Sequence, residues 1–420
     1  MENLSDKTAL VIDTGGEYVS FAQRLARDFK KVYYCTVWQS SFPKWNKYAI
    51  GINVKDIQRI DSPFEVFDIV DIICIPDLYL SDMADWLRDN NYKVFGSGSA
   101  EKIEILRDDF YKMQEKLGMP VPKYEILNGI SELKKYLKNK ENVWVKTNLI
   151  RGNGETFNFK NMRLSESRLD ELQHQLGSFK ENAVFVVSEA IDNAIEVGHD
   201  TLTVNGQYPQ RCLYGLEIKD ACYVSKVVDY TSLPKFLKDI DNKFSNYFKE
   251  NKYSGFYSTE VRWDGKKGYY GDATMRLGQP PSDLQQEIYT NFSEVVYDIA
   301  IGNVPTIENK NGRYGAQVII KSSWATTDAQ AIYFPEKYKN NVKIKHLMYK
   351  DNTPYYVPTD IEMEEIGSVV AVGNTLDEAI KKVKEIAQTV EGDCLSIDLD
   401  AFDEAGKSID KFKKFNLPTI

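Results

Sequence analysis

Lysine and glycine residues in the middle of the chain have the types and the spacing that bind phosphate groups. Lys146 ends the apolar run 143–146 and precedes a turn that contains Gly152 and Gly154. At an effective dielectric constant near 20, one ammonium group about 4 Å from a phosphate oxygen contributes roughly 4 kcal/mol before desolvation. A surface lysine followed by a hairpin loop explains this segment equally well, so both interpretations stay open.

A strand end farther along the chain offers groups that could recognise a nucleoside. The apolar run 184–189 leads into a polar corner that holds Glu189, Ile191 and, seven positions after Glu189, Glu196. A strand end followed by a carboxylate suits the recognition of adenine and ribose. Glutamates that only face solvent are common after strands, so this candidate depends on the other segments.

Two carboxylates, a hydroxyl and a guanidinium form the third candidate group. A turn over 263–267 predicts a hairpin that brings Glu260 close to Asp272. Asp272, Thr274 and Arg276 alternate onto one face of the second strand. Such a set can hold Mg²⁺ or Mn²⁺ and then a transferred phosphoryl group. A cross-strand salt bridge is the competing interpretation, and we favour the metal site over it.

A glycine turn near the start of the chain is a candidate for substrate binding. Residues 8–98 alternate apolar runs with helical patterns, which predicts a parallel sheet with crossover helices. Gly15 and Gly16 follow the first strand, where such sheets meet their ligands. A tight turn that needs glycine is at least as good an explanation, because the full GxGxxG pattern is absent.

The remaining elements follow from periodicity and from turn residues. Apolar side chains three and four apart predict one helix over 99–118, which Ser99 can cap and Gly118 ends. The sequence then predicts a β-rich middle with few long helices, a helix over about 282–301, and a strand-rich tail from about 314. Thr375 and Glu378 predict a capping box at the start of a last helix.

Composition and charge narrow the class of protein. The chain has 420 residues, 42% of them hydrophobic, and a formal charge of −9, so we expect a globular protein that does not bind nucleic-acid polymers. The five cysteines are scattered and odd in number, which predicts buried free thiols. No signal peptide or apolar span is visible, and we expect a cytoplasmic protein that does not enter a membrane.

The order of these motifs resembles the ATP-grasp superfamily, and most closely its glycinamide ribonucleotide synthetase branch (phosphoribosylamine-glycine ligase). The similarity runs over nearly the whole chain. The turn at Gly15 and Gly16 resembles the family's opening turn, segment 116–122 resembles its linker into the ATP-binding region, and segment 373–379 resembles the start of its closing helix.

The resemblance implies roles for individual residues. Lys146 would contact the α-phosphate, and Gly152 and Gly154 would lie in the mobile loop over the phosphates. The other nucleotide contacts that it implies are Arg107 in place of a family lysine, Glu189 with Ile191 at adenine, Glu196 at ribose, and Lys226 with Asp229 near the phosphates.

The resemblance also implies the metal ligands. The family has a glutamate followed by Glu-x-Asn-x-Arg, and this chain has Glu260 followed twelve residues later by Asp272, with Thr274 and Arg276 at the next two pattern positions. Glu260, Asp272 and Thr274 would then hold the metal, and Arg276 with Lys146 would be catalytic. Gly15 and Gly16 would bind substrate.

Three departures from the family pattern bear on the function. Thr274 replaces an asparagine that would be a better magnesium ligand. Asn153 stands where the mobile loop usually has a lysine. The glycine-rich substrate segment expected after Lys226 is replaced by residues 233–239. The last of these departures predicts a substrate that differs from the usual one.

Together the residues and the resemblance predict a multidomain α/β and α+β protein with the ATP-grasp fold. We expect a Rossmann-like domain over 1–98, an ATP-grasp domain over 99–313 with a lid lobe at about 120–190, and a β-rich C-terminal domain over 314–420. The implied activity is ATP-dependent and magnesium-dependent ligation of a small-molecule carboxylate to an amine through an acyl phosphate, by a monomer or homodimer.

Two other functions compete with the ligase. The first is a nucleotide-binding protein on the same fold with weak or no catalysis, since fold does not determine function. The second is a dinucleotide-dependent oxidoreductase, which the first ninety residues suggest but which leaves the middle of the chain unexplained. The histidines His174, His199 and His346 are too dispersed for a metal site.

Overall fold

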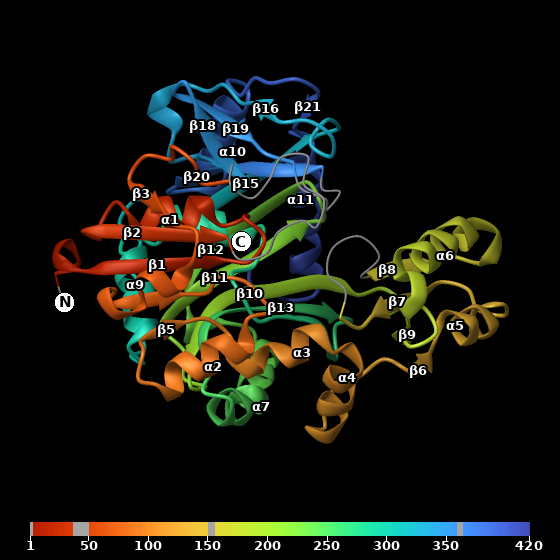
Figure 1. The fold of residues 1–420 in the computed structure, drawn as a ribbon. Coiled ribbons are helices and arrows are strands. Elements are labelled where there is room, and N and C mark those ends of the chain that lie inside the picture. Colours follow the sequence, from red (N-terminus) through yellow and green to blue (C-terminus); the bar gives the residue numbers. More distant parts are fainter. Residues whose placement is uncertain (1–2, 37–49, 150–155, 359–363) are drawn as a thin grey trace. The chain divides into compact units, whose positions relative to one another are not determined.

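The structure is a computed structural model that describes residues 3–36, 50–149, 156–358 and 364–420. The chain forms two compact units (Figure 1). The large unit comprises Met1–Ala100, Gly198–Thr259 and Thr274–Ile420, and the small unit comprises Glu101–Val197 and Glu260–Ala273. The predicted mixed α/β architecture, with a parallel sheet at the N-terminus, is confirmed.

The N-terminal part of the large unit is a five-stranded parallel sheet in the order β3-β2-β1-β4-β5. Its central strand is buried along nearly its whole length, as expected for a parallel strand covered on both faces. The strands are β1 (Thr8–Asp13), β2 (Lys31–Thr36), β3 (Ile57–Arg59), β4 (Ile72–Cys74) and β5 (Val94–Phe95), and the helices of this region are α1 (Val19–Leu25) and α2 (Ser81–Asp89).

A nine-stranded sheet forms the rest of the core of the large unit, in the order β14-β13-β10-β11-β12-β15-β20-β17 with β21 on β15. Three of its strands, β10, β13 and β14, continue into the small unit. The strands are β10 (Ile195–Val204), β11 (Arg211–Ile218), β12 (Cys222–Asp229), β13 (Ser254–Trp263), β14 (Gly268–Thr274), β15 (Tyr314–Ser322), β17 (Val342–Ile344), β20 (Glu365–Gly373) and β21 (Leu395–Ser396).

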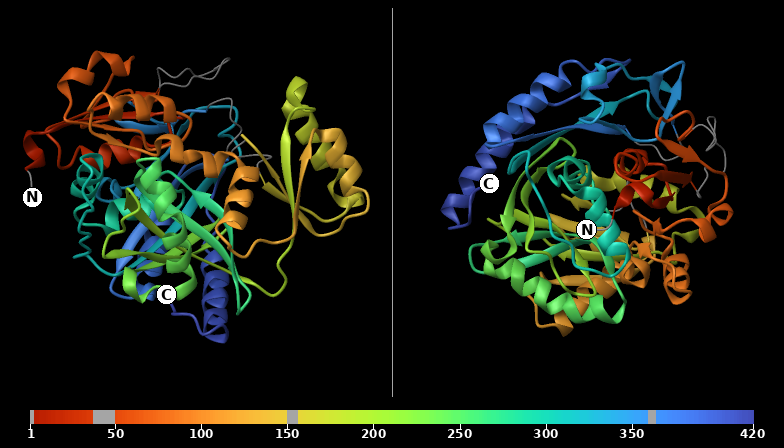
Figure 2. Two further views of the ribbon diagram at one scale, coloured as in Figure 1. Left: turned by 90° about the horizontal axis from the view of Figure 1, so that it is seen from below. Right: turned by 90° about the vertical axis from the view of Figure 1, so that its left-hand side faces the viewer.

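Helices pack against this sheet and end the chain. Helix α8 contacts β20, α10 contacts β15, and α11 contacts β11 and β12; Figure 2 shows α11 beside the sheet at the C-terminal end. The helices are α7 (Lys235–Glu250), α8 (Pro281–Ile288), α9 (Phe292–Ala300), α10 (Leu376–Ala387) and α11 (Ala401–Lys414). A three-stranded sheet completes the unit, made of β16 (Gln330–Ala331), β18 (Leu347–Lys350) and β19 (Thr353–Tyr356).

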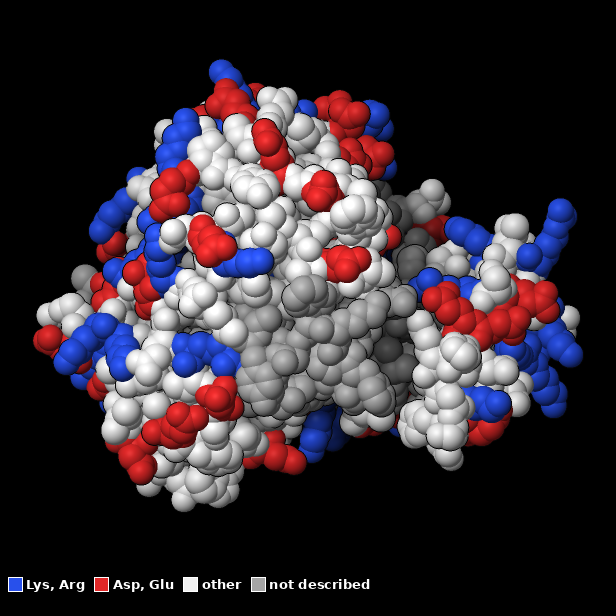
Figure 3. Space-filling view, turned by 45° about the horizontal axis from the view of Figure 1, so that its top comes forward, with Lys and Arg blue, Asp and Glu red and all other residues white. Residues whose placement is uncertain are grey.

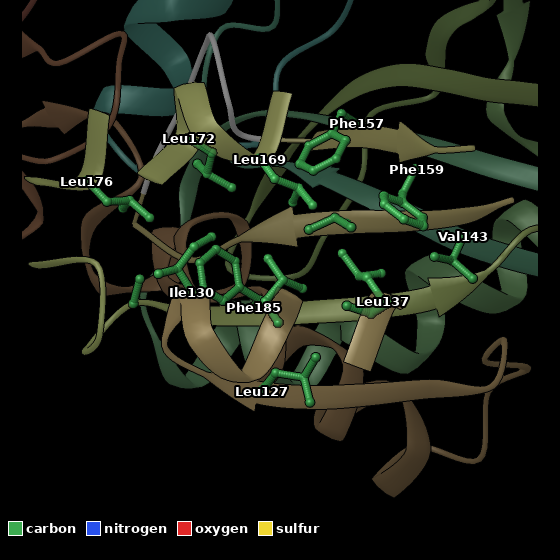
Figure 4. Packing of buried hydrophobic residues seen from close by; sticks show 14 residues of the cluster. Leu127, Ile130, Leu137, Val143, Phe157, Phe159, Leu169, Leu172, Leu176 and Phe185 are labelled. Carbon is green, nitrogen blue, oxygen red and sulfur yellow. The ribbon is translucent and has the colours of Figure 1, made fainter. Parts of the chain in front are cut away.

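The small unit is built on a four-stranded antiparallel sheet in the order β6-β9-β7-β8. Helices α5 (Ile130–Leu137) and α6 (Met162–Leu176) pack their leucines onto one face of it (Figure 4). The strands are β6 (Tyr124–Asn128), β7 (Val143–Thr147), β8 (Thr156–Phe159) and β9 (Val184–Glu189), and α3 (Lys102–Ile105) and α4 (Arg107–Lys116) precede them. The other face of the sheet is not covered by α5 and α6, so it can carry polar side chains such as Lys146.

The prediction of a single helix over 99–118 is wrong. Leu106 has extended backbone angles, φ −100° and ψ 90°, and separates α3 from α4. The break is stabilised because Asn148 Oδ1 accepts a hydrogen bond of 2.8 Å from the Arg107 N–H at the start of α4. Ser99 does not cap this helix, since its N–H and hydroxyl both donate to Asp85. Gly118 follows α4 with φ +62°, as predicted.

The middle of the chain contains long helices that we did not predict. Helices α6 and α7 have 15 and 16 residues, and α7 begins inside the segment 233–239 that departs from the family pattern. The predicted helix over 282–301 is divided at Tyr289, whose ψ of 99° ends α8. At the last helix, Thr375 caps as predicted, but Glu378 accepts from the N–H of Asn374.

Four of the five cysteines are buried, and Cys394 is exposed, which corrects the prediction that all five are buried; all five are free thiols. Positive and negative side chains are interspersed over the face seen in Figure 3. Within the described ranges, every helix is too short or too polar to cross a membrane. The location of the protein and its lack of nucleic-acid partners stay predictions.

Candidate functional site

Lys146 is the centre of a polar group on the small unit. It lies on β7, where Val143 and Val145 point into the core under α5 and α6 and Lys146 points to the other face. Its side chain is only 9% exposed, and its ammonium donates a hydrogen bond of 2.6 Å to the carbonyl oxygen of Gly271. A nearly buried lysine held by the chain's own oxygens is positioned before any ligand binds.

Asp272 brings two of the predicted cations together. Its carboxylate pairs with the guanidinium of Arg107, and its Oδ2 lies 3.9 Å from Nζ of Lys146. Arg107 begins α4 and is 1% exposed, whereas Asp272 on β14 is 21% exposed. The sequence segments of Arg107, Lys146 and Asp272 are far apart in the chain, and the small unit joins them.

A second polar group lies where β10 and β13 continue into the small unit. The guanidinium of Arg262 pairs with the carboxylate of Glu196 and lies 3.8 Å from Oε1 of Glu260. The predicted ribose carboxylate and the predicted metal carboxylate therefore share one cation. Sequence reasoning missed Arg262, although its place two residues after Glu260 puts both on the same face of β13.

Glu189 lies on the opposite face of the four-stranded sheet from Lys146. Strand pairing sets Glu189 beside Val143, on the face covered by α5 and α6, and sets Lys146 beside Val186, on the other face. The Glu189 carboxylate is 59% exposed and lies 3.8 Å from Lys123. Any contact of this strand end with a nucleotide on the Lys146 face would come from backbone groups. Ile191 follows in the connection to β10.

The predicted hairpin that carries the metal candidates is present. β13 and β14 are neighbours in the sheet, and Asp264 Oδ1 accepts hydrogen bonds of 2.7 Å from the N–H groups of Lys266 and Lys267 in the turn. Glu260 and Asp272 are held by different cations, and Thr274 ends β14 where the large unit resumes. Among the residues that the structure describes, no three His, Cys, Asp or Glu residues form a metal-binding group.

The oxygen donors on this hairpin nevertheless suit magnesium. Magnesium in nucleotide enzymes commonly takes one or two carboxylates and completes its shell with phosphate and water oxygens. Glu260 and Asp272 supply two carboxylates, and both side chains are partly exposed. The two carboxylates are thus of the kind that magnesium binds, and in this structure each is engaged by a different arginine, Glu260 by Arg262 and Asp272 by Arg107.

The structure says little about three further residues with predicted nucleotide contacts. Lys226 lies on β12, with its ammonium 5.4 Å from the centre of the Tyr314 ring. Gly152 and Gly154 fall outside the described residues. Their proposed roles stay predictions.

The glycine turn of the large unit is organised by Asp13. This buried carboxylate accepts hydrogen bonds of 2.8 Å from the Gly16 N–H, 2.7 Å from the Tyr18 N–H and 2.7 Å from the Tyr34 hydroxyl. Burial raises the pKa of Asp13 to about 7, and these hydrogen bonds limit the rise. Gly16 has φ +88°, so the turn needs glycine there.

Arg276 lies beside this turn and pairs with a carboxylate that we did not predict. Its Nη1 lies 3.4 Å from Oδ1 of Asp77 and donates a hydrogen bond of 3.1 Å to the Tyr18 hydroxyl. Thr14 donates to the other oxygen of Asp77. Burial raises the pKa of Asp77, and Arg276 opposes that rise.

A second ion pair adjoins the turn. Lys345 Nζ lies 3.2 Å from Glu17 and 2.8 Å from Glu365. Burial is the largest influence on the pKa of Glu17 and raises it, but the charges of Lys345 and Arg276 and a hydrogen bond from Lys345 act together with His346 to lower that pKa. His346 donates its N–H to the carbonyl of Gly16, and burial lowers its pKa to about 4, so its imidazole is neutral at pH 7.

Sequence reasoning could have found Asp77 but not its other neighbours. Asp13 ends β1, and Asp77 follows β4, the strand beside it, so both lie at the carboxyl edge of the parallel sheet. Lys345 and Glu365 come from the C-terminal part of the chain, and no spacing connects them to the turn.

Solved structures with the same fold include a ligase, a carboxylase and a synthetase. No family model and no curated protein sequence matches this chain. Phosphoribosylamine-glycine ligase from Thermotoga maritima aligns with a TM-score of 0.68 and 14% identity over 93% of this chain and 98% of its own. Biotin carboxylase from Campylobacter jejuni, solved as a complex with βγ-ATP, aligns with a TM-score of 0.66 and 16% identity over 98% of each chain.

A third structure gives the same result. N5-carboxyaminoimidazole synthetase from Staphylococcus aureus aligns with a TM-score of 0.56 and 12% identity over 91% of this chain and 97% of its own. These enzymes are ATP-grasp proteins, and the similarity extends over both compact units of this chain. The resemblance that the sequence motifs predicted is thus confirmed at the level of the fold: the chain has the ATP-grasp fold.

Proposed function

We propose that the protein is an ATP-dependent and magnesium-dependent ligase that joins a small-molecule carboxylate to an amine. The observation that carries the proposal is the grouping of Arg107, Lys146 and Asp272 in the small unit of an ATP-grasp fold. Two nearly buried cations beside one partly exposed carboxylate provide charges for phosphate oxygens and an oxygen ligand for a metal ion.

The neighbouring enzymes support this class of reaction. The aligned structures include a phosphoribosylamine-glycine ligase and a biotin carboxylase domain in complex with MgADP and bicarbonate. An ATP-dependent ligase with a different carboxylate and amine agrees with both the shared fold and the departures at Thr274 and at residues 233–239.

In the proposed reaction a carboxylate oxygen attacks the γ-phosphorus of ATP, the bond to the β-phosphate oxygen breaks, and ADP leaves. The amine nitrogen then attacks the acyl carbon, the bond to phosphate breaks, and the nitrogen loses a proton. Lys146 and Arg107 would hold phosphate oxygens, and Arg276 would stabilise the acyl phosphate. Magnesium held by Glu260 and Asp272 would supply charge neutralisation at the β- and γ-phosphates.

Isotope transfer tests this proposal directly. If the carboxylate attacks phosphorus, one ¹⁸O from a labelled carboxylate appears in the released phosphate. We expect ADP release that depends on both a carboxylate and an amine, together with labelled phosphate, when pools of amino acids, keto acids and amines are supplied with MgATP. Unlabelled phosphate would contradict the acyl-phosphate route.

The competing function is a protein that binds nucleotide without turnover. It is favoured by the engagement of Asp272 with both Arg107 and Lys146, since a metal ion would have to share that carboxylate. Such a protein would bind ATP in a calorimetric titration and release no ADP with any pool, which separates it from the ligase.

A further inference from the structure

The glycine turn of the large unit carries more negative than positive charge. Three partly exposed carboxylates, Glu17, Asp77 and Glu365, surround two cations, Arg276 and Lys345. Lys345 is shared between Glu17 and Glu365, and the ion pair of Asp77 with Arg276 is long, at 3.4 Å. We call these five residues the turn cluster.

The groups packed around the turn cluster do not compensate this excess. His346 is neutral at pH 7, because burial lowers its pKa to about 4. The neighbouring Asp283 accepts a hydrogen bond of 2.8 Å from Ser368 and draws on the charges of both Lys343 and Lys345, so it adds to the demand for positive charge. Burial raises the pKa of Asp77, the charge of Arg276 opposes that rise, and the neighbouring carboxylate of Glu17 adds to it.

A buried hydroxyl beside the turn cluster independently indicates a ligand. Tyr356 is fully buried, its ring stacks on His346 at 5.2 Å, and its hydroxyl interacts electrostatically with Lys345, Glu17 and Glu365. Within the described part of the chain this hydroxyl has no hydrogen-bond partner. Buried hydroxyls are normally paired, so the Tyr356 hydroxyl beside this partly exposed charged cluster offers hydrogen-bonding capacity that a ligand could use.

We propose that the turn cluster binds the amine substrate as an unphosphorylated ammonium compound, with Asp77 and Glu17 as its carboxylate partners and the Tyr356 hydroxyl as a further hydrogen-bond partner. This inference rests on the proposed ligase function. An ammonium group restores the charge balance of the turn cluster, whereas a phosphate group would add negative charge to it. The substrate class therefore differs from the phosphorylated amine in the name of the Thermotoga enzyme.

The test uses two amines that differ only in a phosphate group, ethanolamine and O-phosphoethanolamine. Binding of each to the full-length protein is measured by saturation-transfer NMR, without ATP. We expect ethanolamine to bind and O-phosphoethanolamine to bind at least about tenfold more weakly. Equal or tighter binding of the phosphorylated compound, or no binding of either, overturns the proposal.

Two variants connect this binding to the turn cluster. Asp77→Asn keeps the size of the side chain and should weaken ethanolamine binding at least about tenfold. Tyr356→Phe should weaken it several-fold without lowering the melting temperature, because the lost hydroxyl has no partner in the free protein. The control is Tyr214→Phe, another buried tyrosine hydroxyl without a partner but on β11, which should leave binding unchanged. Unchanged binding in folded Asp77→Asn and Tyr356→Phe overturns the proposal.

ADP release separates the failure of this inference from the failure of the ligase proposal. Turnover that requires a phosphorylated amine would overturn the inference and leave the ligase intact. Ethanolamine binding that is lost in Asp77→Asn, without ADP release in any pool of carboxylates, would support the site and contradict the ligase.

Discussion

Lys146 Nζ lies 3.9 Å from Asp272 Oδ2 and donates a hydrogen bond of 2.6 Å to the carbonyl oxygen next to it, that of Gly271. The ammonium of β7 is therefore tied to the edge strand β14 within one compact unit. A lysine held in this way loses less side-chain freedom when it contacts a phosphate, since most of that freedom is already lost.

Replacing Lys146 by glutamine should weaken ATP binding at least about tenfold, which corresponds to about 1.4 kcal/mol. The reason is the loss of a nearly buried positive charge, whose attraction for a phosphate oxygen is only partly screened. Isothermal titration calorimetry with MgATP measures the effect. Lys135→Gln, an exposed lysine on α5, is the matched control and should bind ATP as the wild type does.

Replacing Arg276 by alanine should leave ATP affinity within about threefold and lower turnover at least about 100-fold, because a cation that acts on a reaction intermediate affects the rate more than ground-state binding. Arg276 pairs with Asp77 in the large unit. Coupled ADP-release assays give the turnover, and Arg163→Ala on α6 is the exposed control. Equal ADP-release rates in Arg276→Ala and the wild type would contradict the role.

The two glycines of the turn should tolerate alanine differently. At Gly16 a Cβ atom would lie 2.8 Å from Cδ1 of Ile50, and φ is +88°, so Gly16→Ala should lower the free energy of unfolding by about 2 kcal/mol or more. At Gly15 a Cβ atom would lie 3.7 Å from its nearest neighbour. Gly15→Ala should therefore change the free energy of unfolding by less than about 1 kcal/mol. Urea unfolding measures both, and equal effects would contradict the described turn.

Local sequence signals predicted the regular elements well where a single pattern determined them. The strand Val184–Glu189 has the predicted bounds, because it is an apolar run between turn residues. Leu106 breaks a helix that its periodicity continues, because the side chain of Asn148 binds the backbone there from another segment. Periodicity carries no information about such a distant partner.

The candidate site could likewise be predicted only where a single segment of sequence determined it. The types of Lys146 and Asp272 and their places at strand ends indicated phosphate and metal chemistry. The face on which Glu189 lies depends on the pairing of β7 with β9, and the sequence does not determine that register. Lys345 and Tyr356 reach the glycine turn from far along the chain, so only the fold places them there.

His346 should make the protein less stable in acid. Its folded pKa, about 4, lies below the usual value of 6.5, so between these values the unfolded chain binds a proton that the folded chain does not. The protein therefore loses roughly 3 kcal/mol of stability through His346 as the pH falls from 6.5 toward 4.

The matched variant for this prediction is His346→Asn. Asparagine does not titrate and tolerates the φ of +47° at this position. The raised pKa of Asp13 makes the folded protein more stable as the pH falls, over an overlapping pH range. This contribution is the same in the wild type and in the variant, so it cancels when their stabilities are compared. Urea unfolding at pH 7, 6, 5 and 4.5 should give a shallower loss of stability in the variant. Parallel pH profiles would mean that the pKa of His346 is not lowered in the folded protein.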